Sequence, residues 1–334
     1  MSKVTVVGAG LAGCEAAWAL AQAGIEVTLC EMKPQKYSPA HSYHGFAELV
    51  CSNSLKAMRI ESAAGLLKEE MRRLGSLILE CARQAAVAAG GALAVDRTVF
   101  SDKVTEKICS HPKIRIARGE IGEIPQDYVI IATGPLTSDK LAAGIQQQCG
   151  SHYLSFYDAA APIVSYDSID TEQIFFAARY DRGEADYINC PFDKEQYEHF
   201  WEELVGARQA PLHEFDARPA VYEGCMPIEV LARRGMDTLR FGPVGLRNPE
   251  TGHRPWAVVQ LRRENAAGSL YNLVGFQTNL NFPEQKRVFS MIPGLQNAEF
   301  LRYGVMHRNT FIDSPRLLSS DFSLHTEPRI YFPL

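Results

Sequence analysis

The feature that most constrains this chain is a glycine-rich turn near its N-terminus, in the run V-T-V-V-G-A-G-L-A-G-C-E-A-A that begins at Val4. The apolar residues before the turn predict a strand, and the alanine-rich residues after it predict a helix. Gly24 ends that helix, and residues 25–29 predict a second strand. The three glycines have the G-x-G-x-x-G spacing of a dinucleotide-binding βαβ unit, which allows the backbone and the helix N-terminus to approach a pyrophosphate.

An acidic residue completes this motif. Glu31 ends the second strand, eighteen residues after Gly13, where a carboxylate accepts from a ribose 2′-hydroxyl. An acid at this place favours FAD or NAD over NADP, and the position of the motif at the N-terminus favours FAD. A later strand, 128–132, runs into A-T-G-P and is expected to return to the cofactor. The predicted cofactor-binding residues are Gly8, Ala9, Gly10, Leu11, Ala12, Gly13, Glu31, Thr133 and Gly134.

Length and a change in local amino-acid composition along the chain predict two domains. The chain has 334 residues, of which 46% are hydrophobic, enough for a large core. We predict an α/β protein with an FAD-binding, two-dinucleotide-binding (Rossmann-like) fold in 1–150 and 295–334. Residues 151–294, where aromatic, proline and charged residues mix, are expected to form an inserted α+β domain that carries substrate recognition. Within the first domain, 113–117 predicts another strand and 54–89 predicts mostly helix.

Charge and cysteine usage narrow the class of protein. The net charge of −5 argues against a generic nucleic-acid binder, although residues 220–334 carry 13 Lys and Arg against 10 Asp and Glu. The eight cysteines are widely spaced and form no metal-ligand or disulfide pattern, so we expect reduced thiols and no metal. Glycines and Glu15 interrupt the apolar N-terminal run, so neither a signal peptide nor a membrane span is expected, and the predicted location is the cytoplasm.

Two cysteines differ from the others by their neighbours. Cys51 lies in E-L-V-C-S-N-S-L-K, where helix-capping residues follow it, so the sequence predicts a thiol at a helix N-terminus with a stabilised thiolate. Cys225 lies in Y-E-G-C-M-P-I-E, where Glu229 is placed to act as a base or to orient one. Taken alone, each pattern is also that of a small buried hydrophobic residue. The other six cysteines are interpreted as structural.

Several motifs together resemble the bacterial folate- and FAD-dependent tRNA (uracil-5-)-methyltransferase family. The resemblance runs through the whole chain and rests on G-A-G-L-A-G-C-E-A-A, E-L-V-C-S-N-S-L-K, A-G-G-A-L-A-V-D-R, I-A-T-G-P-L-T-S, F-Y-D-A-A-A-P-I-V, Y-E-G-C-M-P-I-E, A-V-V-Q-L-R, Y-N-L-V-G-F-Q-T and R-Y-G-V-M-H-R-N-T-F. The C-S-N-S and E-G-C-M-P-I-E motifs separate this family from the FAD-dependent wobble-uridine enzymes, which share the N-terminal fold.

The resemblance implies an activity and roles for residues. It implies methylation of carbon 5 of the T-loop uridine in the tRNA T-arm, with 5,10-methylenetetrahydrofolate as the one-carbon donor and FAD and NAD(P)H as reductants. Cys225 corresponds to the attacking thiolate, and Cys51 to a second functional thiol beside the flavin. His307 is the candidate that stacks on folate, with His41 and His44 as competitors. Arg302 and Arg308 are expected at the glutamate tail and Asn309 at the pterin.

The chain departs from the family pattern in two places. A short lysine-containing insert between Pro243 and Val244 is missing, and the family's final glycine turn and helix after R-I-Y-F are absent. We therefore expect an exposed sheet edge near Ile330 and weak FAD retention. Two alternative functions remain: a shortened, catalytically impaired member that still folds or binds tRNA, and a related wobble-uridine enzyme.

Overall fold

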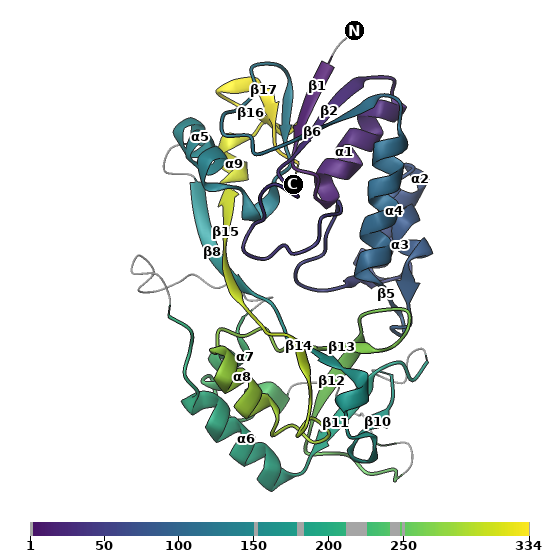
Figure 1. Cartoon of the computed structure of the whole chain (residues 1–334), viewed down its shortest axis with the longest axis vertical. Helices are drawn as coiled ribbons and strands as arrows, with labels where there is room; N and C mark the ends of the chain where they lie inside the picture. Colours follow the sequence, from purple (N-terminus) through teal and green to yellow (C-terminus); the bar gives the residue numbers. More distant parts are fainter. Residues whose placement is uncertain are drawn as a thin grey trace.

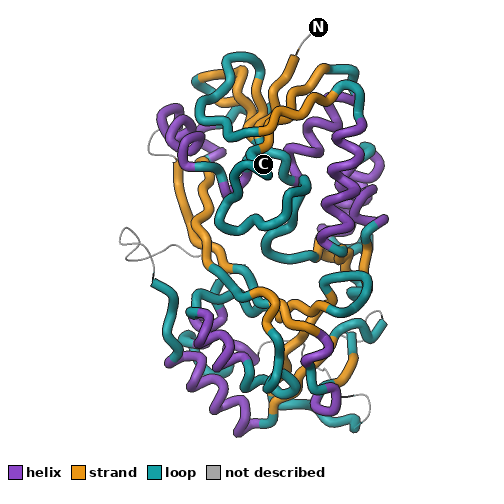
Figure 2. The backbone as a smooth tube through the Cα atoms, viewed as in Figure 1, coloured by secondary structure: helices purple, strands orange, loops and turns teal. Residues whose placement is uncertain are grey.

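The computed structural model describes residues 3–149, 153–178, 184–211, 226–240, 248 and 251–333, and all structural statements below concern these residues (Figure 1). For 153–158, 307 and 308 only the backbone is described. Two sheets with their own helices lie at opposite ends of the molecule, and a long two-stranded ribbon runs between them (Figure 2).

The first sheet is the parallel sheet that the N-terminal motif predicts. Its strand order is β16-β17-β7-β1-β2-β6, and only the β16–β17 pair is antiparallel. The strands are β1 (Lys3–Val7), β2 (Glu26–Glu31), β6 (Ile114–Arg118), β7 (Val129–Ile131), β16 (Ser323–Leu324) and β17 (Glu327–Tyr331). The four strands expected in the first 132 residues are therefore confirmed to within two residues at each end.

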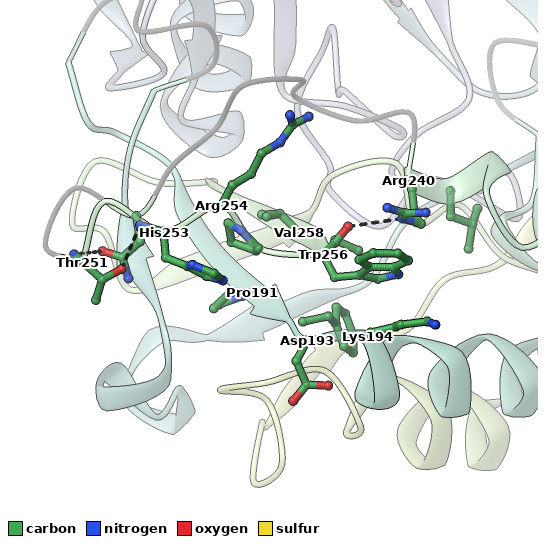
Figure 3. A pocket seen from close by; sticks show the side chains of 14 residues that line it. Pro191, Asp193, Lys194, Arg240, Thr251, His253, Arg254, Trp256 and Val258 are labelled. Carbon is green, nitrogen blue, oxygen red and sulfur yellow. Dashed lines mark hydrogen bonds between the residues drawn. The ribbon is translucent and has the colours of Figure 1, made fainter.

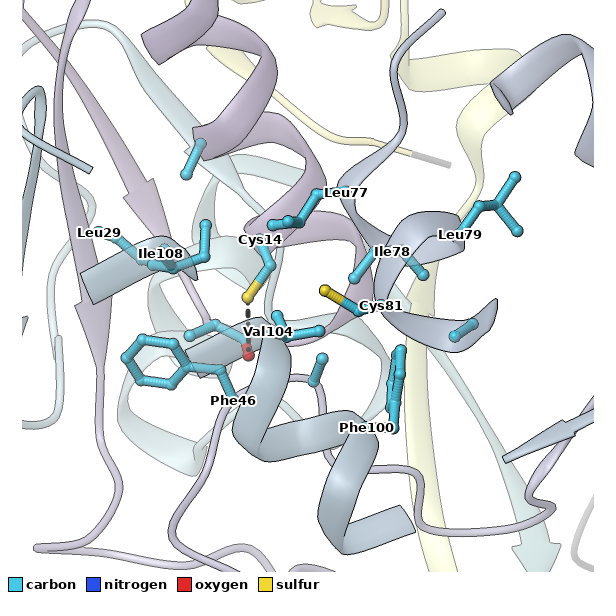
Figure 4. Close-up of a cluster of buried hydrophobic side chains, with 14 of the residues drawn as sticks. Cys14, Leu29, Phe46, Leu77, Ile78, Leu79, Cys81, Phe100, Val104 and Ile108 are labelled. Carbon is cyan, nitrogen blue, oxygen red and sulfur yellow. Dashed lines mark hydrogen bonds between the residues drawn. The ribbon is translucent and has the colours of Figure 1, made fainter. Parts of the chain in front are cut away.

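Helices cover both faces of this sheet. Because side chains alternate along a strand, Val6 and Leu29 face one core while Val7 and Cys30 face another. The first core is closed by α1 (Leu11–Gln22), α3 (Leu77–Gln84) and α4 (Arg97–Ser110), whose buried side chains surround Cys14 (Figure 4). The second is closed by α5 (Asp139–Cys149). Burial on both faces explains why the strands are apolar throughout.

The region 54–89 differs from its prediction. It begins with a strand, β3 (Ser54–Ala57), which pairs antiparallel with β5 (Ala92–Val95), and β5 also pairs with β4 (Ala86–Val87). The helices are α2 (Ala63–Arg73), capped by Ser62, and α3. The prediction of a helix directly after Cys51 is therefore wrong, because pairing with a distant strand outweighed the capping residues at 52–54.

The second sheet is antiparallel and matches the α+β character expected for the middle of the chain. Its order is β10-β11-β12-β13-β9-β14. The strands are β9 (Ile163–Ser165), β10 (Phe175–Phe176), β11 (Ile188–Phe192), β12 (Ala257–Arg263), β13 (Leu270–Leu273) and β14 (Phe300–Arg302). Its core includes side chains from α6 (Lys194–Gly206), α7 (Ile228–Ala232) and α8 (Phe282–Phe289).

The ribbon that joins the sheets consists of β8 (Tyr153–Ala159) and β15 (Met306–Ile312), paired antiparallel over their whole length. Leu295 and Ala298 belong to the second core, and β14 belongs to the second sheet. The domain division expected from the sequence stays a prediction, and we propose to move its boundary from residue 295 toward residue 303.

Short helices are η1 (Gly134–Leu136), η3 (Tyr166–Ser168), η4 (Thr171–Gln173), η7 (Thr238–Arg240) and α9 (Ser314–Leu317).

The sheet edge near Ile330 is covered. β17 pairs on one side with β7 and on the other with β16, and Ile330 is fully buried in the core that includes Leu141 and Ile145 of α5. The expectation of an exposed edge is therefore wrong, because a local hairpin and α5 supply the cover. No helix in the described ranges is long and apolar enough to cross a bilayer.

Candidate functional site

A cavity of about 320 Å³ opens at the carboxyl ends of β1, β2 and β7, where parallel sheets bind their ligands. Eight of the nine residues predicted from the dinucleotide motif and the A-T-G run line it: Gly8, Ala9, Gly10, Leu11, Ala12, Glu31, Thr133 and Gly134. Gly13 packs behind the wall. The structure thus gathers two segments more than 100 residues apart in the chain, and binding of FAD by these residues stays a prediction.

The three motif glycines are required for different reasons. A Cβ on Gly8 would lie 2.8 Å from the carbonyl oxygen of Ala132, and Gly8 has a φ of +98°. A Cβ on Gly13 would lie 1.8 Å from the carbonyl oxygen of Gly8, so the helix can approach the strand only without a side chain. A Cβ on Gly10 would meet no protein atom within 4 Å. Gly10 therefore leaves open space at the cavity wall that a side chain would fill.

Helix α1 begins at this wall, and its own residues place no carboxylate in front of its first N–H groups. Its N-cap residue, Gly10, provides no side-chain cap, and its first turn contains no acidic residue. The first backbone N–H groups of a helix have no partner within the helix, and they carry a partial positive charge. The residues at this end, Leu11 and Ala12, line the cavity. This end of α1 can therefore accept a phosphate group.

Two backbone hydrogen bonds hold the Glu31 side chain in the same cavity. Its carboxylate is buried and accepts hydrogen bonds from the backbone N–H of Ala9 at 2.9 Å and of Lys33 at 2.8 Å. Each carboxylate oxygen has a second lone pair, so Glu31 keeps the capacity to accept from a ligand hydroxyl. The bond to Ala9 also ties the acid to the glycine turn.

A buried ion pair that the sequence analysis missed shapes the adjacent loop. Lys33 pairs with Glu48 at 3.0 Å and donates to the carbonyl oxygens of Tyr43 at 3.0 Å and Gly45 at 2.7 Å. The side chains of Lys33 and Glu48 are 5% and 10% exposed. The pair fixes the loop that brings His41 and Glu48 to the cavity wall. The only signal for it in the sequence was two opposite charges, 15 positions apart.

A second cavity, of about 230 Å³, continues from the first. The two share Thr133, Gly134, Pro135 and Thr137, and the second is also lined by Thr310 and Phe311 of β15 and by Phe332. The Thr310 hydroxyl donates to the carbonyl oxygen of Pro135 at 3.3 Å, which fastens β15 beside the A-T-G segment. Thr310, Phe311 and Phe332 were not predicted, although the first two directly follow the candidates 307–309.

Arginine side chains hold the segment that carries Cys51. Arg97 donates to the carbonyl oxygen of Leu49 and, at 3.0 Å, to that of Cys51. Arg302 donates to the carbonyl oxygen of Val50 at 3.0 Å. Val50 lines the dinucleotide cavity, so Cys51 lies one residue from its wall. The Cys51 segment (residues 49–51) is therefore fixed between the cavity and the second sheet.

The residues around this segment form a buried polar network. Arg97 pairs with Glu264 at 2.6 Å, and the Glu264 side chain is only 3% exposed. Asn53, which is fully buried, donates to the carbonyl oxygens of Val95 and Arg263 and accepts from Arg262 at 2.8 Å. Strands β5 and β12 are thereby linked through the residues that follow Cys51.

The electrostatic setting of Cys51 comes from these arginines and not from a helix. Burial, followed by repulsion from Arg97, lowers the pKa of Arg302, while the nearby carboxylates of Glu264 and Glu48 act in the opposite direction. Nearby guanidinium groups favour a thiolate. Cys51 is half-buried and in no disulfide. An activated thiol therefore remains the prediction for Cys51, with a different cause from the helix N-terminus expected.

Five other cysteines are in settings that keep the thiol protonated. Burial raises the pKa of Cys81 to about 11 and also raises the pKa values of Cys14, Cys30, Cys149 and Cys190. Cys109 is exposed. In the part of the chain that the structure describes, no cluster of three or more His, Cys, Asp or Glu residues is placed to hold a metal ion.

Of the residues predicted around Cys225, the structure describes Glu229, whereas Cys225 itself lies outside the described residues. Glu229 lies in the first turn of α7 and is fully buried, and its carboxylate accepts from the Thr278 hydroxyl at 2.9 Å and from the Asn279 N–H at 2.8 Å. Burial raises the pKa of Glu229. These bonds hold α7 in place, whereas the prediction of a base beside Cys225 is untested.

The folate candidates lie on the ribbon. The backbone of 307 and 308 is in β15, opposite β8, and the side chain of Asn309 is buried. Of the two competing histidines, His41 lines the dinucleotide cavity, whereas His44 packs against the ring of Tyr43 at 4.5 Å. His307 and His41 thus both remain candidates.

Comparison with known proteins decides the family. The model of the family described as "Glucose inhibited division protein A" matches residues 3–333. A curated relative from Acetivibrio thermocellus, the methylenetetrahydrofolate–tRNA-(uracil-5-)-methyltransferase TrmFO, is 60% identical over 98% of this chain and 76% of its own length. The chain belongs to this methyltransferase family. The resemblance found in the sequence is therefore confirmed.

Further relatives agree. The TrmFO of Enterococcus faecalis is 56% identical over 99% of this chain and 76% of its own length. Among solved structures, GidA of Aquifex aeolicus superposes with a TM-score of 0.72 at 14% identity, over 99% of this chain and 59% of that one. At this identity the structural likeness supports the fold alone, which confirms the predicted α/β class.

Proposed function

We propose that this protein methylates carbon 5 of the T-loop uridine in tRNA in the bacterial cytoplasm, using 5,10-methylenetetrahydrofolate, FAD and NAD(P)H. The observation that carries the proposal is the dinucleotide cavity whose wall includes Val50, next to Cys51, in a chain 60% identical to a named TrmFO. The same sequence identity supports this activity over that of a wobble-uridine enzyme.

The cavity suits FAD. The space left at Gly10 accommodates a pyrophosphate against the backbone, the start of α1 stabilises its charge, and Glu31 accepts from a ribose hydroxyl. The second cavity, over Gly134 and along β15, offers room for the rest of the cofactor. When bound, FAD would supply the reducing equivalents that convert a transferred methylene group into a methyl group.

The thiols perform the pyrimidine chemistry in this proposal. Carbon 5 of uracil is a weak nucleophile, so the Cys225 thiolate first adds to carbon 6 and produces an enolate. Carbon 5 of the enolate then bonds to the one-carbon unit. Loss of the proton from carbon 5 expels tetrahydrofolate from that unit, and after the unit has been reduced the Cys225 sulfur leaves carbon 6 as the thiolate. We assign that proton transfer to Cys51, because Arg97 holds its carbonyl oxygen and Arg302 holds that of Val50, and a neighbouring guanidinium group would stabilise a thiolate.

The folate is assigned to the ribbon side of the cavity. His307 or His41 would stack on the pterin, Asn309 would hydrogen-bond it, and Arg308 would meet the glutamate tail. This assignment is supported by the position of β15 beside the A-T-G segment, where Thr310 contacts Pro135. It brings the one-carbon donor to the same cavity as FAD.

Covalent trapping tests this function. A T-arm RNA with 5-fluorouridine at the target position should form an adduct with the wild-type protein, because fluorine at carbon 5 prevents the proton loss that releases the enzyme. Cys225→Ala should form none. Cys51→Ala should lose methylation, measured as 5-methyluridine by mass spectrometry.

Cys109→Ala is the matched control, since it removes an exposed thiol outside the site and should leave both adduct and methylation unchanged. Equal trapping by Cys225→Ala would disprove the nucleophile assignment. A colourless wild-type protein that binds tRNA but forms neither adduct nor 5-methyluridine would favour the impaired family member instead.

A further inference from the structure

A larger cavity, of about 790 Å³, lies in the second sheet unit between the beginning of β12 and the beginning of α6 (Figure 3). Basic and aromatic side chains gather there, among them Lys194, Arg240, His253, Arg254 and Trp256. It shares no residue with either cavity of the dinucleotide site. The proposed function makes no use of it so far.

Trp256 is the centre of this cavity, which we name the Trp256 pocket. Trp256 is 39% exposed. The guanidinium carbon of Arg240 lies 3.7 Å from the ring centroid, and the ammonium of Lys194 lies 5.7 Å from it. Figure 3 shows these cations on opposite sides of the ring. Arg240 also donates to the Trp256 carbonyl oxygen at 3.2 Å, so the aromatic platform is held in place.

The charges of the pocket are partly available to a ligand. Arg240 pairs with Asp237, and Lys194 with Glu198 at 3.7 Å, so their charges are partly neutralised. Arg254 is exposed and forms no ion pair with the described part of the chain. The carboxylate of Asp193 accepts from the Gln196 N–H at 2.8 Å as part of the α6 capping box. The pocket therefore offers cationic and aromatic surface, and Asp193, the one acid among the described residues that line it, is held in the cap of α6.

We propose that the Trp256 pocket binds a phosphate and an adjoining base of the tRNA substrate at a distance from the reacting uridine, an inference that rests on the proposed function. A protein of net charge −5 repels RNA on average, so binding needs local cationic sites. Arginine and lysine contact phosphates, and an unstacked RNA base stacks on an aromatic side chain or on a guanidinium plane. Arg240 covers one face of Trp256, so the base would take the place of the Lys194 side chain, which is 64% exposed, on the other face.

The test measures binding of a full-length tRNA transcript over a range of salt concentrations. Trp256→Ala should raise Kd about fivefold or more, since one stacked base contributes about 1–3 kcal/mol. Arg254→Gln should also raise Kd, because it removes a charged contact with a phosphate. Arg254→Gln should also reduce the slope of log Kd against log salt by about 0.7–0.9, the loss of one phosphate contact. Trp256→Phe keeps an aromatic face and should bind nearly as the wild type does.

Arg83→Gln is the matched control, because Arg83 is an exposed arginine of α3 with no ion pair in the described residues. It should leave Kd unchanged. In the methylation assay, the pocket variants should raise KM for tRNA and leave kcat unchanged.

An unchanged Kd and salt slope in both pocket variants would overturn the inference, as would a raised KM for NAD(P)H with unchanged tRNA binding, which would make this a dinucleotide pocket. Failure of the proposed function looks different: the wild type then methylates no tRNA, while the binding comparison still reports on the pocket.

Discussion

At the scale of single residues, two glycines of the dinucleotide motif have different tasks, one in ligand binding and the other in folding. Gly10 faces open space, whereas Gly13 touches the backbone of Gly8. The sequence pattern names both glycines without distinguishing them. Only the structure shows that one leaves room for a ligand and the other for the packing of a helix on a strand.

Gly10→Ala is therefore expected to weaken FAD binding about tenfold or more while the apoprotein keeps its stability, since the methyl group occupies ligand space and meets no protein atom. Gly13→Ala is expected to destabilise the apoprotein by about 3 kcal/mol or more. Flavin titration and urea unfolding of the apoprotein measure the two effects. Equal loss of stability in both variants would contradict the distinction.

At the scale of elements, short helix α7 depends on a buried acid. Glu229 in its first turn accepts from Thr278 and Asn279, and the pKa of Glu229 is raised by burial. The helix has only five residues, too few to be stable by itself. Its position is therefore set by a contact between residues that lie 50 positions apart in the sequence.

The raised pKa predicts a pH dependence with a definite sign. Between the ordinary value of 4.5 and the raised value, the folded state binds more protons at Glu229 than the unfolded state does. The free energy of unfolding should therefore fall as pH rises through that window. Glu229→Gln should remove this slope, as measured by urea unfolding between about pH 4.5 and about pH 8. A slope that persists unchanged in the variant would assign it to other groups.

At the scale of the whole molecule, the two sheet units are joined by buried polar contacts as well as by the ribbon. Asn53 connects β5 to β12, and the pair of Arg97 with Glu264 spans the same joint. The Cys51 segment lies within this joint, so we expect the reactivity proposed for its thiol to depend on how the two units are held.

Asn53→Ala removes two donors and an acceptor from a fully buried position, and should cost about 2–4 kcal/mol. It should also separate the unfolding of the two units, seen as two transitions in calorimetry. The control is Asn297→Ala, at an exposed position of the second unit, which should change stability by less than about 0.5 kcal/mol. A single transition at the wild-type temperature would show that Asn53 does not join the units.

The sequence by itself determined the dinucleotide unit, because its turn, helix and acidic residue lie within 31 residues and follow local rules of backbone conformation. It also identified the family, through motifs that are readable without a fold. Tertiary structure decided what surrounds Cys51: Arg97, Arg262 and Arg302 reach residues 50–53 from 46, 209 and 252 positions away. It also turned residues 54–57 into a strand and buried Ile330 under β16 and α5. These outcomes depend on contacts between distant segments, and such contacts form only when the folded chain brings their partners together.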